Sequence, residues 1–444
     1  LAGAYLVRRK NVSLAPVSRQ VAAPVFLQSH QTAVAPPVPA ASIPAAAETV
    51  AAAPAVSAKI PDALKKPAAF SVEETGTAKP ALVFLAPGLS RSSLNAVRLA
   101  LATGNAQSAL DALKSLPAPA EGSDGAKEAA VLEGRALLEL GNVEHARKIF
   151  EPLAFASVET ERGADALFGN FVCQAGTLQR CRDSELEQVL LGAKSWGAAN
   201  AAMEAARRAE DSASGDSAAL EKARRLYQLA LETGKLDDGN DARCLARLTE
   251  LTNKIVLDAK VVCATPKPIF HKVESGDSVE RIAKKYKVNQ GQIKIINKLN
   301  DKLVVRLGQN LKMLPGDVVY KVSRTHLHGT LYIDGVFIRR YPVGIGPGDA
   351  TPIGTYAVER KAVNPDWYYD GKRVPYGDPA NILGTRWMAF AGTDKDGAGL
   401  GLHGTSLPES VPGRESKGCV RMRNSHVEEI YDLMPQGGKV EIAD

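Results

Sequence analysis

The sequence predicts a multidomain α+β chain, and three observations support that prediction. The chain has 444 residues, too many for a single hydrophobic core, so we expect about two to four domains. The sequence begins with an Ala/Pro-rich segment, continues with helical periodicity and ends with strand-like runs separated by Gly and Pro. The formal net charge of +6 is mild and spread along the chain, so we expect no nucleic-acid partner.

Residues 1–88 are rich in Ala, Pro and Val, as in "AVAPPVPAASIPAAAETV". Such a segment buries too little apolar surface to offset the entropy of ordering, and we predict a disordered linker. The opening "LAGAYLVRRK" has too few apolar residues to span a bilayer. We interpret it as a possible remnant of a membrane anchor, which leaves a membrane tether open.

Residues 89–262 show helical periodicity with an internal repeat. Arg98 to Leu116 and Arg135 to Leu153 share a Gly-Asn turn, a following alanine and a closing leucine, at a period of about 37 residues. The second copy resembles a tetratricopeptide repeat, with small or aromatic packing residues at Gly134, Gly141, Ala146 and Phe150. The resemblance implies a surface for a protein partner, while a purely structural spacer is equally open. We expect this region to be dispensable for turnover on soluble stems, since none of its residues belong to the catalytic signature.

Residues 268–316 predict a compact βααβ unit with Asp277 or Ser278 capping its first helix. The segment resembles a LysM module at Val273, Gly276, Asp277, Ile282, Ala283, Tyr286, Val288, Ile293, Asn297, Gly308, Gln309 and Leu311. The resemblance implies binding to N-acetylglucosamine-containing glycan, in bacteria peptidoglycan, with candidate contacts at Gly276, Asp277, Ser278 and Asn297. A generic small linker domain is the alternative.

Residues 317–444 predict a mostly-β domain, either a sandwich or a barrel-like sheet. "TLYIDGVFIRRYPVGIG" has an Asp-Gly turn between two strand-like runs, which is a strong hairpin signal. One clear helix, "NSHVEEIYDLM", follows near the end of the chain, and we expect Asn424 or Ser425 to cap it.

Cysteine is sparse, with five in the chain. Cys173 could pair with Cys181, and Cys244 with Cys263, which would leave Cys419 odd. An odd cysteine in an exported protein is free and reactive or bonded to another molecule. The competing interpretation of Cys419 is a buried inert thiol.

The sequence around Cys419 favours a catalytic role for this residue. A cysteine nucleophile needs a neighbouring base and oriented donors for the oxyanion. His403 could be that base, and Gly418 would let the backbone turn sharply so that amide groups face the oxyanion. Ser416 could orient the histidine or the substrate carbonyl, and Arg421 could hold a substrate carboxylate.

The pattern "HGT…SKGCVRM" resembles the active-site signature of the L,D-transpeptidases, the YkuD catalytic domain. Thr351, Pro352 and Gly354 match the family's upstream Thr-Pro-x-Gly segment, and "NILGTRWM" resembles another family stretch, with isoleucine where proline is usual. Lys417 stands where many members have histidine.

The resemblance implies that Cys419 attacks the carbonyl of the diamino acid at stem position three, with His403 as base and then acid. It implies peptidoglycan cross-linking with release of D-alanine and no metal or organic cofactor. Further candidate substrate contacts are Thr405, Lys417, Trp367 and Tyr369. The three aromatics at 367–369 could equally be core residues or part of a lid over the cleft.

The family resemblances imply peptidoglycan as partner and a location in the bacterial cell envelope, periplasmic or wall-associated. Three other functions stay open: a Cys/His peptidoglycan peptidase, an L,D-carboxypeptidase and a non-catalytic wall-binding scaffold. The order of His403 before Cys419 argues against a papain-like peptidase. His326 and His328 could share a strand face, but without a third ligand we predict ordinary strand residues and no metal site.

Overall fold

The computed structural model describes residues 93–154, 158–369, 371–393 and 399–444, which all fall in one compact unit, Ala81–Asp444. The expected disordered linker over 1–88 lies outside these residues. Across the described ranges, no helix combines the length and apolar character needed to cross a membrane.

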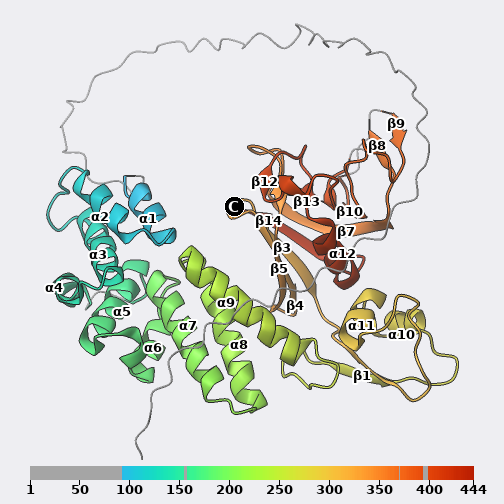
Figure 1. Ribbon diagram of the computed structural model, residues 1–444, viewed down its shortest axis with the longest axis horizontal. Coiled ribbons are helices and arrows are strands. Elements are labelled where there is room, and N and C mark those ends of the chain that lie inside the picture. Colours follow the sequence, from blue (N-terminus) through green and yellow to red (C-terminus); the bar gives the residue numbers. More distant parts are fainter. Residues whose placement is uncertain (1–92, 155–157, 370, 394–398) are drawn as a thin grey trace, which may run out of the picture. The chain divides into compact units, whose positions relative to one another are not determined.

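The multi-helix region begins the described chain (Figure 1). Its Gly-Asn turns form as expected, because Gly104 and Gly141 adopt left-handed φ values of 74° and 78°. The ring of Phe150 packs where only glycine fits, since a Cβ on Gly134 would lie 2.8 Å from it. The helices are α1 (Asn95–Ala102), α2 (Ala106–Lys114), α3 (Asp124–Glu139), α4 (Val143–Leu153), α5 (Glu161–Ala175), α6 (Asp183–Leu190), α7 (Trp196–Asp211), α8 (Ser217–Glu232) and α9 (Asp238–Leu251), with a 3₁₀ turn at Leu178–Arg180 and a π-helix, η3, at Thr252–Val256.

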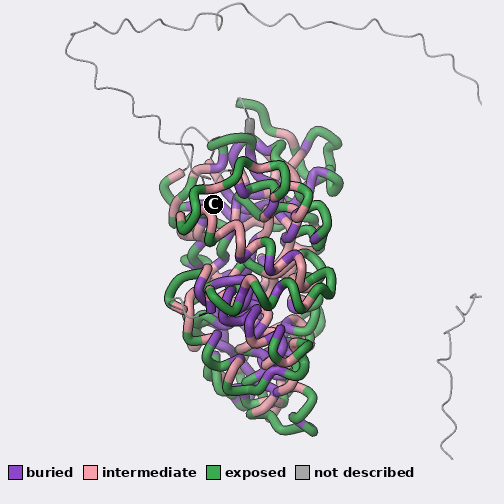
Figure 2. The backbone as a smooth tube through the Cα atoms, turned by 90° about the vertical axis from the view of Figure 1, so that its left-hand side faces the viewer, coloured by how far each residue is buried: buried purple, intermediate pink, exposed green. Residues whose placement is uncertain are grey.

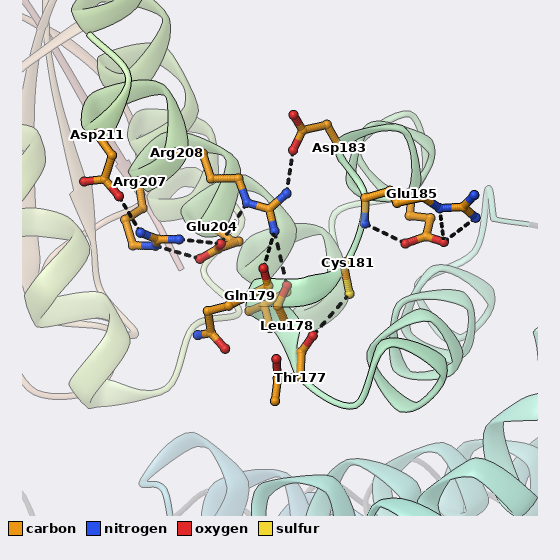
Figure 3. A network of polar contacts seen from close by, with 11 residues as sticks. Thr177, Leu178, Gln179, Cys181, Asp183, Glu185, Glu204, Arg207, Arg208 and Asp211 are labelled. Carbon is orange, nitrogen blue, oxygen red and sulfur yellow. Dashed lines mark hydrogen bonds and ion pairs between the residues drawn. The ribbon is translucent and has the colours of Figure 1, made fainter. Parts of the chain in front are cut away.

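These packing contacts agree with a helical repeat, while the tetratricopeptide identity stays a prediction. Figure 3 shows how neighbouring helices are joined by charge: Arg208 of α7 pairs with Glu204 on its own helix and with Asp183 at the start of α6. The same guanidinium donates to the carbonyl oxygens of Leu178 and Gln179. One arginine thus holds α6 and the 3₁₀ turn against α7.

The LysM segment has the predicted βααβ order, β1 (Ile269–Lys272), α10 (Val279–Tyr286), α11 (Gln290–Asn297) and β2 (Asn310–Met313). The two strands pair antiparallel, with Ile269 opposite Met313. Ser278 caps α10 by accepting the N–H of Arg281, whereas the Asp277 carboxylate accepts the N–H of Glu274. Of the two candidates, serine is therefore the cap.

The C-terminal region is a mostly-β domain built on a 10-stranded mixed sheet in the order β12-β6-β13-β11-β10-β7-β14-β3-β4-β5. The Asp-Gly hairpin forms between β4 and β5, and a separate two-stranded hairpin, β8–β9, stands apart from the sheet (Figure 1). One helix, α12 (Asn424–Leu433), follows β13. The strands are β3 (Val318–Ser323), β4 (His328–Ile333), β5 (Val336–Pro342), β6 (Gly344–Ile345), β7 (Gly354–Val363), β8 (Trp367–Tyr369), β9 (Lys372–Val374), β10 (Arg386–Phe390), β11 (Gly401–His403), β12 (Gly413–Arg414), β13 (Val420–Arg421) and β14 (Lys439–Ala443).

The hydrophobic core of the C-terminal domain extends beyond the sheet into the helical region. One continuous cluster of buried side chains joins residues of α7, α8, α9 and η3 to residues of the sheet and of α12. Leu248 of α9 and Phe337 of β5 both belong to it and are fully buried. In Figure 2 the exposed residues follow the outer turns of the chain and the buried residues lie inside. The last helices of the repeat region are therefore also core elements of the C-terminal unit.

Candidate active site

A cavity of about 510 Å³ lies on the C-terminal domain and brings together most of the predicted catalytic and substrate-binding residues. Its lining includes Cys419, His403, Ser416, Lys417, Arg421 and Trp367. Its charged lining residues also include Arg360, Lys361 and Asp366, which the sequence patterns do not single out.

The sheet register places the two central residues on one face. β11 and β13 run parallel, with His403 opposite Arg421 and Leu402 opposite Val420. Cys419 directly precedes β13, so its side chain points to the same side as Arg421, two residues on. Leu402 and Val420 alternate to the other side and are fully buried. The thiol, the imidazole and the guanidinium therefore share the cleft face.

His403 is held in one tautomer. Its Nδ1 lies 2.6 Å from the carbonyl oxygen of Gly404, which can only accept, so Nδ1 carries the proton. Burial lowers the pKa of His403 to about 4, and the nearby charge of Arg421 acts in the same direction. The imidazole is therefore neutral at physiological pH, with Nε2 able to accept a proton.

Cys419 is half-buried and is a thiol in the resting chain. Burial raises the pKa of its Sγ, although a backbone hydrogen bond from Gly401 and the charge of Arg421 oppose the rise. With a low histidine pKa and a high cysteine pKa, the two groups rest as a neutral pair rather than as thiolate and imidazolium.

The other cysteines differ in their surroundings. Cys173, Cys181, Cys244 and Cys263 are buried thiols, so the two disulfides left open by the sequence are not formed. Burial raises the pKa of Cys173 and Cys181 to about 11 and that of Cys244 to about 12.

The loop before Cys419 is fixed by two hydroxyl groups. Ser416 Oγ donates to the carbonyl oxygen of Cys419 at 2.6 Å and accepts the N–H of Gly418 at 3.2 Å. The buried Thr351 donates to the carbonyl oxygen of Gly418 at 3.0 Å and accepts the N–H of Gly346 at 2.8 Å. Ser416 thus orients the backbone of Cys419 and not the histidine. The Gly418 N–H is already hydrogen-bonded to Ser416 Oγ.

Gly418 is required by its conformation and by its surroundings. Its φ of 133° lies in a region open almost only to glycine. A Cβ there would lie 2.6 Å from the carbonyl oxygen of Ala350.

The β8–β9 hairpin contributes one wall of the cleft, because Trp367 and Tyr368 line it. Asn381 ties the two feet of the hairpin together by donating to the carbonyl oxygens of Pro365 and Val374, at 3.0 and 3.2 Å. Tyr369 ends β8, and its side chain is outside what the structure describes.

The remaining predicted residues are placed as follows. Thr405 is buried, its hydroxyl bonds to the backbone of Leu407, and it is not part of the cavity lining. Lys417 is exposed at the cleft rim. His326 lies in the turn before β4, not on the strand with His328. Over the described residues, no group of three or more His, Cys, Asp or Glu side chains could hold a metal ion.

The candidate glycan contacts lie away from this cleft, in the LysM segment. Gly276 forms the left-handed turn before α10, with φ of 88°. The Asn297 side chain donates to Ile293 and Lys312 and accepts from Lys312, so it joins α11 to β2. Glycan binding by Gly276, Asp277, Ser278 and Asn297 stays a prediction.

Comparisons with known proteins agree with both C-terminal segments. Residues 317–442 match the family model described as L,D-transpeptidase catalytic domain (YkuD), and residues 271–313 match the LysM domain model. The chain is 38% identical over 139 residues to "Putative L,D-transpeptidase YqjB" of Bacillus subtilis, covering 31% of this chain and 77% of that protein. It is 25% identical over 183 residues to "Putative L,D-transpeptidase YkuD" of Bacillus licheniformis, covering 39% of this chain and 98% of that protein. Among solved structures, L,D-transpeptidase 3 from Mycobacterium tuberculosis aligns with a TM-score of 0.24 and 19% identity, over 31% of this chain and 66% of that chain.

Proposed function

Because the chain belongs to the L,D-transpeptidase family, we propose that it cross-links peptidoglycan through a cysteine acyl-enzyme formed on tetrapeptide stems. Its transpeptidase and LysM domains imply peptidoglycan binding, and a cell-wall enzyme family implies a location in the cell envelope. We place it in the periplasm or on the wall itself.

The observation that carries the proposal is the position of Cys419 and His403 on one face of the sheet, inside one cavity. Cys419 Sγ attacks the carbonyl carbon of the diamino acid at stem position three while its proton passes to Nε2 of His403. A C–S bond forms and an oxyanion develops. When this intermediate collapses, the C–N bond to D-alanine breaks, and His403 returns the proton to the leaving amine.

The second half reverses these roles. The amine of a neighbouring stem attacks the thioester carbon and loses a proton to His403. The C–S bond breaks, and the proton returns to the Cys419 sulfur. A neutral histidine suits this cycle, because it can accept a proton at the start of each half and donate it at the end.

The charges of the cleft suit the proposed substrate. Arg360, Lys417 and Arg421 line it, against the single carboxylate of Asp366. The amine of the fourth basic lining residue, Lys361, instead donates to the carbonyl oxygens of Tyr431 and Met434. Peptidoglycan stems carry carboxylates, which arginine and lysine bind by charge-assisted hydrogen bonds.

The LysM domain supports this activity by avidity. Enzyme and substrate would share one polymer, so glycan binding raises the effective concentration of stems at the cleft. The helical region keeps two predicted roles, a surface for a partner protein or a spacer. The Cys419→Ala chain should still sediment with insoluble peptidoglycan, because the LysM segment is separate from the thiol.

The test is mass spectrometry of products formed by the full chain from purified tetrapeptide stems. We expect cross-linked dimers and free D-alanine, lost in Cys419→Ala and kept in Cys263→Ala, which removes a buried thiol outside the cleft. Tripeptide without dimer would instead identify an L,D-carboxypeptidase. Cleavage at another stem bond would identify a peptidase, and wall binding without turnover would identify a scaffold.

A further inference from the structure

Asn424 does not do what its position suggests. It is the first residue of α12, where a capping role was expected, but the N-cap is Arg423 and no side chain caps the helix. The prediction that Asn424 or Ser425 caps α12 is therefore wrong. The Asn424 side chain turns away from its own helix toward two loops.

The amide oxygen of Asn424 accepts two backbone N–H groups, from Thr405 at 3.0 Å and from Thr385 at 3.3 Å. Thr385 directly precedes β10, and Thr405 follows β11 by two residues. One side-chain oxygen therefore joins the loops at the ends of two paired strands.

Both loops are packed tightly onto that oxygen. A Cβ added to Gly384 or to Gly404 would lie 2.2 Å from Asn424 Oδ1. Real Cβ atoms do not approach an oxygen so closely, so only glycine allows either loop to reach the amide. The contact is thus built into three positions and not into Asn424 alone.

The link to the cleft is a single peptide group. The carbonyl of Gly404 accepts the proton of His403 Nδ1 at 2.6 Å, and the N–H of the same peptide, on Thr405, donates to Asn424. A peptide group is planar, so its carbonyl and its N–H cannot turn independently. Fixing the N–H therefore fixes the direction of the carbonyl that selects the tautomer of His403.

We propose that Asn424 is a positioning residue for His403, which holds the Gly404–Thr405 peptide plane so that Nε2 stays unprotonated and directed to the cleft. This inference rests on the proposed function in one respect, the role of His403 as base. Asn424 itself touches no reacting atom; it acts through the peptide.

The experiment uses the full chain and a small electrophile, iodoacetamide, so that it needs no peptidoglycan. The rate of Cys419 alkylation is measured by mass spectrometry at pH 7 for Asn424→Ala, Asn424→Asp and the control Ser425→Ala. Aspartate keeps an oxygen acceptor at the same reach, and Ser425 is an exposed neighbour in the same turn. We expect a loss of about tenfold in Asn424→Ala, recovery to within about threefold in Asn424→Asp, and no change in Ser425→Ala.

A double-mutant comparison separates positioning from general damage. If Asn424 acts through His403, Asn424→Ala should slow alkylation in the wild-type background but not in His403→Ala. An equal loss in both backgrounds, or a loss in Asn424→Asp as large as in Asn424→Ala, would overturn the inference. Thermal unfolding of each variant checks folding. If Asn424→Ala does not fold, Asn424→Ser, whose hydroxyl is too short to reach both amides, takes its place.

Nitrogen NMR of the His403 ring gives a readout independent of any rate. The wild-type chain should show the proton on Nδ1, and Asn424→Ser should show a mixture of tautomers. An unchanged tautomer in Asn424→Ser contradicts the inference. Failure of the proposed function would give different results. In one, Cys419 in His403→Ala is alkylated as fast as in the wild-type chain. In the other, alkylation depends on His403 and Asn424, but no cross-links form.

Discussion

The hydroxyl of Ser416 lies 2.6 Å from the carbonyl oxygen of Cys419, within the loop that presents the proposed nucleophile. The Ser416 hydroxyl oxygen also accepts the N–H of Gly418 at 3.2 Å, so one side chain bonds to the backbone on both sides of the Gly418–Cys419 peptide. In the proposed mechanism, the direction of that peptide sets where its amide group faces the oxyanion.

Ser416→Ala should therefore slow acylation of Cys419 by about tenfold, since a hydrogen bond contributes about 1 kcal/mol and its loss lets the loop move. The measurement is single-turnover acyl-enzyme formation followed by mass spectrometry. Ser410→Ala is the matched control, because Ser410 is also buried and also donates to a carbonyl three residues away, at 2.7 Å, outside this loop. Equal losses in the two variants would show that Ser416 has no special role.

Gly418→Ala should damage both stability and turnover. Its φ of 133° disfavours any side chain, and the new Cβ would press on the carbonyl oxygen of Ala350. A residue held in such a conformation costs about 1–3 kcal/mol, so we expect thermal unfolding several degrees lower. Gly348→Ala is the control, because Gly348 also has positive φ but no atom within 4 Å of the new Cβ. A Gly348→Ala chain that loses as much stability as Gly418→Ala would contradict this account.

The pH dependence follows from the low pKa of His403. Burial lowers it from an ordinary 6.5 to about 4, and the neutral form is the proposed base. Acylation should therefore persist as the pH falls below 6 and reach half its rate near pH 4. The acylation rate is followed from pH 3.5 to 8, with circular dichroism as the check that the chain stays folded. A midpoint near 6.5 would mean that the imidazole is solvated during catalysis.

The same shift has a consequence for stability. The unfolded chain binds a proton at His403 below its ordinary pKa of 6.5, whereas the folded chain does so only near pH 4. The free energy of unfolding should thus fall as the pH decreases from 6.5 to 4, and His403 should contribute no further change below that range. His328, whose pKa burial lowers to about 3, adds a loss of the same sign.

Sequence patterns indicate candidate residues by their chemistry, but they do not indicate residues whose role depends on contacts across the fold. Cys419 and His403 are candidates because a cysteine nucleophile needs a neighbouring base, and because the surrounding residues resemble a family signature. Thr351 belongs to a recognisable motif, but the sequence does not predict its hydrogen bond to Gly418, because the two residues are 67 positions apart and meet only in the folded chain. The capping prediction for Asn424 is wrong because local preference favours a helix cap, whereas its oxygen accepts the N–H groups of Thr385 and Thr405, which are 39 and 19 residues away in the sequence.

For the fold, too, local features are predictable from the sequence and long-range packing is not. The βααβ order, the Asp-Gly hairpin and the helical periodicity are local patterns, and each is present in the structure. The shared core between the last helices and the sheet is not local, because it depends on which apolar faces meet. The expectation that the repeat region is dispensable was drawn from motif position alone, and the shared core calls for a direct test of it.

Gln228 of α8 offers that test. Its side-chain amide donates to the carbonyl oxygen of Gly335 at 2.7 Å and accepts the N–H of Phe337 at 3.0 Å. β5 is the edge strand of the sheet, so this amide occupies backbone groups that a neighbouring strand would otherwise take. Helix α8 therefore covers part of an edge that would be exposed without it.

Gln228→Ala should lower the thermal midpoint by several degrees, because four hydrogen bonds of up to about 1 kcal/mol each are lost. Two of them join α8 to Gly335 and Phe337, and two lie within α8, with Arg224 and Glu232. Hydrogen exchange gives the specific readout: the Phe337 amide should lose protection, whereas amides in the middle of the sheet should keep it. Gln107→Ala is the matched control, since Gln107 is an exposed residue of α2 and its amide donates to the Asp111 side chain. A chain shortened to begin at residue 265 should lose more, because it also lacks Leu248 and the other buried residues of α9 and η3. If that shortened chain unfolds at the same temperature as the full one and its Phe337 amide stays protected, the helices are dispensable to the fold and the shared core contributes nothing measurable.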